Sequence, residues 1–99
     1  MGVMGMATFR VKMLPTLEDE KRMRVEAIKR EAHSILAQTD WYVVRHQETG
    51  APIPQAVLDY RAAVRAATDR GEAEIAALTD VEAVRAYRVE WPPKPEGVA

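Results

Sequence analysis

Two histidines and one serine are the residues of this chain whose types most readily support chemistry. His33 and Ser34 are neighbours in a stretch with helical periodicity, and neighbouring helical side chains point about 100° apart, so the two cannot exchange a proton. His33 and His46 have no cysteine between them and match none of the common zinc spacings. We therefore expect no catalytic site, no metal site and no cofactor, and we expect that the chain is not an enzyme.

The composition excludes several classes of partner. The 99 residues are enough for one domain, and the absence of cysteine removes disulfides and thiolate ligands as sources of stability. The 14 Lys and Arg residues are balanced by 15 Asp and Glu residues without a basic patch, so we expect no nucleic-acid partner. No apolar run approaches the roughly 18 residues of a membrane span, and the first residues lack the features of a secretory signal, so we expect no membrane partner.

A long first helix is predicted from Leu17 to Ala37 or somewhat beyond. Thr16 can cap its start, and three acidic residues follow where the helix dipole favours negative charge. Residues suited to burial then recur every three or four positions and define one face of the helix: Val25, Ile28, Ala32, Ile35, Leu36 and Thr39.

A second helix is predicted after a connector that contains Gly50 and two prolines. Gly50 suits the end of the preceding helical stretch, and Pro54 suits the first turn of the next helix. Helical periodicity then continues to about Ala67, and the segment Asp69-Arg70-Gly71 predicts a break. We expect the two long helices to pack antiparallel.

A short third helix is predicted from Thr79 to about Tyr87, because Thr79 and Glu82 have the spacing of a capping box. The prolines after Trp91 then require an extended C-terminal segment. The predicted fold class is mainly α, with two antiparallel helices, a short third helix packed across them, an extended N-terminal strand and a Pro-rich C-terminal segment. The predicted units are an N-terminal arm (1–15), a helical domain (16–93) and a tail (94–99).

The N-terminal arm contains a candidate strand. Residues 8–13 alternate in polarity, which places Phe9, Val11 and Met13 on one face. A single strand of this length is not stable alone, so it needs another extended segment beside it. Three arrangements remain open: pairing with residues 88–91 of the same subunit, docking onto a second copy or a partner protein, and an arm without fixed structure.

The ends of the two long helices carry the residues most suited to a partner. We expect Trp41 to be mostly buried between these helices, since an exposed indole would forgo about 2 to 3 kcal/mol of burial. We expect Asp40 to form an ion pair with Arg61 or Arg65 that joins the helices. Tyr60 and the two arginines also suit a face shown to a partner.

Several of these residues occur in an ordered pattern over about residues 25–93. Leu36-Ala37-Gln38-Thr39-Asp40-Trp41 is followed by Gly50 with Pro52, then by Tyr60-Arg61-Ala62-Ala63-Val64-Arg65, and finally by Trp91-Pro92. In this order the chain resembles the phage tail assembly chaperone-like family. The segment 1–15 has no counterpart in that pattern, and the insert at about 70–84 is longer than the short loop expected there, so a separate role is expected for these two regions. The candidate partner-binding or motif residues are Asp40, Trp41, Tyr60, Arg61, Arg65 and Trp91.

The resemblance implies an accessory protein that helps a phage tail fibre protein fold, trimerise or attach, without catalysis or cofactor. The expected partner is a tail fibre or baseplate protein, and a homo-oligomer is an open alternative. The expected location is the host cytoplasm during assembly, or the virion tail. A second hypothesis is a permanent structural component of the virion, bound to fibre or baseplate. A third hypothesis, a small helical nucleic-acid binder, is disfavoured because the arginines sit among acidic neighbours.

Overall fold

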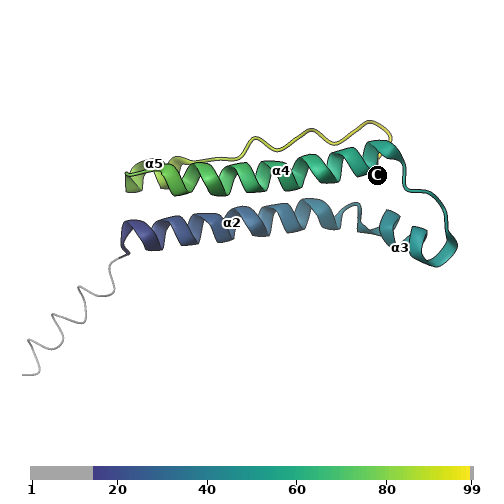
Figure 1. The fold of residues 1–99 in the computed structure, drawn as a ribbon, viewed down its shortest axis with the longest axis horizontal. Coiled ribbons are helices and arrows are strands. Elements are labelled where there is room, and N and C mark those ends of the chain that lie inside the picture. Colours follow the sequence, from purple (N-terminus) through teal and green to yellow (C-terminus); the bar gives the residue numbers. More distant parts are fainter. Residues whose placement is uncertain (1–14, 99) are drawn as a thin grey trace, which may run out of the picture.

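The computed structural model describes residues 15–98, and this part of the chain folds into four helices. They are α2 (Leu17–Ala37), α3 (Asp40–Thr49), α4 (Gln55–Ala77) and α5 (Val81–Ala86). α2 and α4 lie side by side in opposite directions, and α3 belongs to the connection between them (Figure 1). The predicted mainly α class is confirmed. Within residues 15–98 there is no strand, and the predicted strand at 8–13 lies outside this range.

The first long helix has the predicted bounds. Thr16 accepts a hydrogen bond from the backbone N–H of Asp19 through its hydroxyl, and the Asp19 carboxylate accepts one from the backbone N–H of Thr16. This reciprocal capping box satisfies two N–H groups at the start of α2. A second helix, α3, follows after a bend at Gln38 and ends at Gly50, whose φ of 76° is the left-handed conformation that glycine adopts readily. The sequence predicted this cap, but not that the helical stretch before it is a separate helix.

The predicted end of the second long helix near Ala67 is wrong, because α4 continues through Gly71 to Ala77. Gly71 is buried, and a Cβ atom placed there would lie 3.2 Å from Val89 Cγ2 and 3.6 Å from Ile28 Cδ1. The glycine therefore makes room for the close approach of two neighbouring segments, and this advantage outweighs its low helix propensity.

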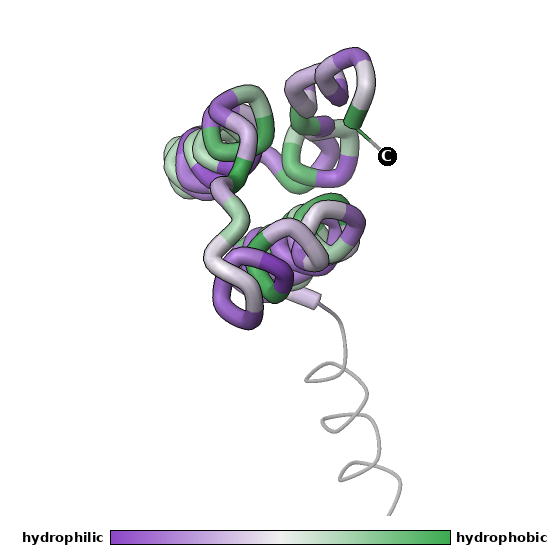
Figure 2. The backbone as a smooth tube through the Cα atoms, turned by 90° about the vertical axis from the view of Figure 1, so that its right-hand side faces the viewer, coloured by the Kyte–Doolittle hydropathy of each residue, from purple (hydrophilic) through white to green (hydrophobic). Residues whose placement is uncertain are grey.

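The capping prediction for the last helix is also wrong by one residue. Asp80, not Thr79, caps α5 by accepting a hydrogen bond from the backbone N–H of Ala83, and the helix ends at Ala86. From Tyr87 onward the chain runs back beside α4 toward the end of the molecule that holds α3 (Figure 1). Viewed along the helices, α2, α4 and this last stretch of chain occupy three corners of a triangle (Figure 2).

The core lies between these three corners. It contains two clusters of buried residues: Ile28, Ile75 and Val84 in the first, and Ala32, Tyr60 and Val64 in the second. Trp91 packs against both clusters and so links them along the molecule. None of the helices in residues 15–98 combines the length and the apolar character that a membrane crossing requires.

Candidate functional site

The corner between α2 and α3 is the point where three of the motif residues, Thr39, Asp40 and Arg61, converge. Thr39 is completely buried there, and its hydroxyl donates to the carbonyl oxygen of Leu36 at 3.2 Å. Its side chain does not cap α3, although Thr39 occupies the N-cap position. The hydroxyl instead faces the interior, where it meets α4.

Arg61 reaches this corner from α4. Its Nη1 atom donates to the carbonyl oxygen of Leu36 at 2.9 Å and to the hydroxyl of Thr39 at 2.8 Å, and it lies 3.0 Å from Asp40 Oδ1. The Arg61 side chain is only 11% exposed, whereas the Asp40 side chain is 54% exposed. The predicted ion pair between Asp40 and Arg61 is therefore confirmed, and its arginine end is buried. We call these contacts of Arg61 the corner clamp.

Arg65 and Tyr60 have other roles than the sequence suggested. Arg65 lies one turn further along α4, is exposed, and borders a shallow groove with Lys29 and Asp69. Among the ion pairs of the described residues, Asp40 pairs with Arg61 and not with Arg65. Tyr60 is 8% exposed and belongs to the core cluster with Ala32 and Val64, so it contributes to packing.

The prediction that Trp41 is buried between the long helices is wrong, because the residue is 44% exposed. Thr39 and Arg61 already fill the gap at this corner. Trp41 follows two residues later, roughly 200° round the helix, so its indole points outward. Its ring stacks on Tyr42, with centroids 3.8 Å apart and an interplanar angle of 26°.

A basic side chain of the same helix covers this aromatic pair. The guanidinium carbon of Arg45 lies 5.1 Å from the centroid of Trp41 and 5.5 Å from that of Tyr42, within the range of cation–π attraction. Val44, one helical turn after Trp41, is 48% exposed. We call Trp41, Val44 and Arg45 the α3 outer face. The sequence analysis missed Tyr42 and Arg45, although the three- and four-residue spacings within the segment 41–45 could have indicated this cluster.

Trp91 takes part in packing and not in the α3 outer face. Its ring rests on the two core clusters, and its indole N–H donates to Glu31 Oε2 at 3.0 Å. The residue therefore holds the C-terminal stretch against α2. The hydrogen bond gives the half-buried indole N–H an acceptor.

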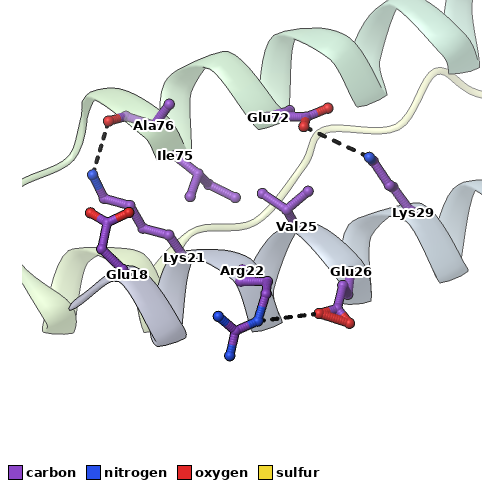
Figure 3. A pocket seen from close by; sticks show the side chains of 9 residues that line it. All are labelled: Glu18, Lys21, Arg22, Val25, Glu26, Lys29, Glu72, Ile75 and Ala76. Atoms are coloured by element: carbon purple, nitrogen blue, oxygen red, sulfur yellow. Dashed lines mark hydrogen bonds and ion pairs between the residues drawn. The ribbon is translucent and has the colours of Figure 1, made fainter. Parts of the chain in front are cut away.

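A second surface feature is an open groove between α2 and α4 (Figure 3). Val25 and Ile75 form its apolar part, and charged side chains border it. Several of these charges are already engaged, as in the ion pair of 3.7 Å between Lys29 and Glu72. Histidine and serine are absent from its lining.

The structure thus brings together Thr39, Asp40 and Arg61 and places Trp41 outside them, whereas Tyr60 faces the core. Within the part of the chain that the structure describes, no group of three or more His, Asp or Glu residues is arranged to hold a metal ion. Comparison with known proteins finds no matching family model, no matching curated protein and no matching solved structure.

Proposed function

We propose that this chain is a phage tail fibre assembly chaperone, which binds the tail fibre protein and assists its folding, trimerisation or attachment. The proposal starts from the ordered motif that resembles the phage tail assembly chaperone-like family. The way the fold uses that motif supports it. Thr39, Asp40 and Arg61 fix the direction of α3, and Trp41, the next residue of the motif, is presented on the outside.

The observation that carries the proposal is a tryptophan that is exposed but held in place. Leaving Trp41 in water forgoes about 2 to 3 kcal/mol of burial, an amount that a partner could recover. Stacking on Tyr42 and the cation–π contact with Arg45 restrict the ring before any partner arrives. Less side-chain entropy is then lost on binding, and tryptophan and arginine are enriched where partner proteins bind most strongly. The α3 outer face therefore suits a protein partner.

Co-expression with the tail fibre protein tests the proposal. We expect the chain to increase the yield of soluble, trimeric fibre, and Trp41→Ala to abolish this increase without changing the circular dichroism of the chain. Met23→Ala is the matched control, because Met23 is 46% exposed and lies on α2, next to α5. This control should preserve the increase. A fibre yield that is the same with and without the chain would contradict the chaperone function.

The alternative of a permanent virion component, bound to the fibre or the baseplate, makes use of the same surface. The two functions differ in what happens after assembly. Proteomics of purified particles separates them, because a chaperone acts in the host cytoplasm and is absent from the finished particle. A stoichiometric amount in the virion tail would instead establish the permanent component.

A further inference from the structure

Two opposite charges lie one turn apart on α3. Arg45 belongs to the α3 outer face, and the exposed Glu48 follows it by three residues, so the two positions are neighbours on the helix surface. Among the ion pairs of residues 15–98, none includes Arg45 or Glu48. The guanidinium of Arg45 lies over Trp41 and Tyr42, because helical side chains lean toward the N-terminus. This direction leads away from Glu48.

Two further side chains of α3, Asp40 and His46, are already engaged. Asp40 pairs with Arg61 in the corner clamp. The His46 ring donates a hydrogen bond through Nδ1 to the carbonyl oxygen of Ala51 at 2.9 Å. Arg45 differs from them, because its Nε atom is buried without a hydrogen-bond partner among the described residues. Part of the hydration of this guanidinium is thus already lost, so less desolvation remains to oppose pairing with a carboxylate.

We propose that the α3 outer face, together with Glu48, binds the same surface of a second copy of this chain across a two-fold axis. In such an isologous contact the two α3 helices run antiparallel, and every contact between two different residues occurs twice. With the axis between positions 45 and 48, Arg45 of each copy faces Glu48 of the other, which gives two ion pairs. Trp41 and Val44 lie on the same side of α3 and are 44% and 48% exposed, so the second copy also covers apolar surface.

Charge complementarity favours a second copy over a segment that carries one sign of charge. An acidic segment would be attracted by Arg45 and repelled by Glu48 at the neighbouring position, and a basic segment would meet the reverse. A second copy presents a positive and a negative charge in the same spacing, so in one fixed register each charge meets its opposite. The surface is therefore complementary to itself.

The length of α3 sets the strength of the contact. Its 10 residues extend over about 15 Å, so the buried area falls below the roughly 1,200–2,000 Å² of a stable interface. We therefore expect a weak dimer that forms as the concentration rises. One consequence rests on the proposed function: the fibre and the second copy compete for Trp41, so the dimer covers this residue until the fibre binds. Dimer formation is measured without the fibre, so it can fail while the proposed function stands, and the reverse also holds.

Analytical ultracentrifugation of the chain alone tests this contact. The average mass of the wild-type protein should rise toward that of a dimer between micromolar and submillimolar concentrations. Arg45→Glu and Glu48→Arg each place like charges opposite one another and should weaken the association at least about tenfold. Arg30→Glu, at an exposed arginine of α2, is the matched control for Arg45→Glu and should associate like the wild-type protein. A wild-type protein that stays monomeric, or a dimer that either variant at position 45 or 48 retains, would overturn the proposal.

Mixing the two single variants separates charge pairing from loss of structure. Arg45→Glu carries negative charges at both positions, and Glu48→Arg carries positive charges at both. Each variant alone should be monomeric with an unchanged circular dichroism spectrum. An equimolar mixture should form a heterodimer, because both pairs across the two-fold axis are then attractive. A mixture that stays monomeric would show that pairing of these charges does not join the copies.

Tryptophan fluorescence reports whether the α3 outer face is the surface that becomes covered. The emission of the wild-type protein should shift to the blue as the concentration rises, because the Trp41 indole leaves water. Trp41→Phe, in which Trp91 is the remaining tryptophan, should show no such shift. A wild-type spectrum that stays constant while the mass rises to that of a dimer would place the contact on another surface and contradict the proposal.

Discussion

Arg61 Nη1 lies 2.8 Å from the hydroxyl oxygen of Thr39, so a charged side chain of α4 fastens the corner where α2 gives way to α3. The same nitrogen reaches the carbonyl oxygen of Leu36, which is one of the last acceptors of α2. Asp40 supplies the countercharge from the exposed side. The direction of α3 therefore depends on Arg61, a residue of α4. The outward direction of Trp41 depends in turn on the direction of α3.

Arg61→Met is expected to lower the free energy of unfolding by about 3 kcal/mol, because the buried acceptors at Thr39 and Leu36 lose their charged donor. Asp40→Asn is expected to cost only about 0 to 1 kcal/mol, since the Asp40 side chain remains more than half exposed. Urea unfolding of the two variants measures both values.

Arg65→Met is the matched control for Arg61→Met, because both arginines lie on α4 and only Arg65 is exposed. We expect Arg65→Met to change the free energy of unfolding by no more than about 0.5 kcal/mol. Equal losses for the two variants would show that the corner clamp contributes nothing specific.

The extent of the helices was predictable where the signals are local. The bounds of α2 follow from the Thr16 cap and from a regular apolar spacing, and both are properties of neighbouring residues. The length of α4 was not predictable in this way, because the segment Asp69-Arg70-Gly71 has a composition typical of a helix break. Gly71 lies inside the helix because Val89 packs closely against it, and Val89 is near Gly71 only in the folded chain.

The candidate site was predictable in part for a similar reason. Opposite charges near facing helix ends were enough to predict the pair of Asp40 and Arg61. The orientation of Trp41 was not, because it depends on which side chains fill the corner, and burial of Thr39 with Arg61 decides this. Hydrophobicity alone favoured a buried tryptophan, and competition for that space overrode it.

Gly71→Leu is expected to push the C-terminal stretch away from α4 and to lower the free energy of unfolding by about 1 to 3 kcal/mol. Gly71→Ala should leave the free energy of unfolding nearly unchanged. Its gain in helix propensity, about 1 kcal/mol, is opposed by a Cβ atom only 3.2 Å from Val89 Cγ2. Tryptophan fluorescence in a Trp41→Phe background reports on Trp91 and should shift to the red only for Gly71→Leu. An unshifted spectrum for Gly71→Leu would contradict the close packing.

Acid is expected to weaken the attachment of α5 to α2. The carboxylate of Glu20 accepts two hydrogen bonds from Arg85, at 3.1 and 2.9 Å, and these lower the pKa of Glu20 below its ordinary value. A lowered folded-state pKa means that the stabilisation is present above the ordinary pKa of about 4.3 and is lost as the pH falls through the folded-state value. Urea unfolding across this pH range should show a steeper loss for the wild-type protein than for Glu20→Gln. Parallel curves would rule out this pair as a source of acid sensitivity.

High pH is expected to weaken the contact between Tyr87, directly after α5, and Glu74 of α4. Its phenol donates a hydrogen bond to Glu74, and this bond, together with partial burial, raises the pKa of Tyr87. Because the folded-state pKa is raised, the stabilisation is present below the ordinary pKa of about 10 and is lost as the pH rises through the folded-state value.

The titration of Tyr87 alone can be measured by tyrosinate absorbance. It is the difference between the absorbance titration of the wild-type protein and that of Tyr87→Phe. We expect this difference to titrate above the ordinary tyrosine pKa. Glu74→Gln should move it back toward the ordinary value, because a neutral amide accepts the phenol proton more weakly than a carboxylate does and no longer repels the phenolate. If the Tyr87 titration stays at the ordinary value in the wild-type protein, the hydrogen bond to Glu74 does not persist in solution. In that case the alkaline loss of stability should be the same for Tyr87→Phe as for the wild-type protein.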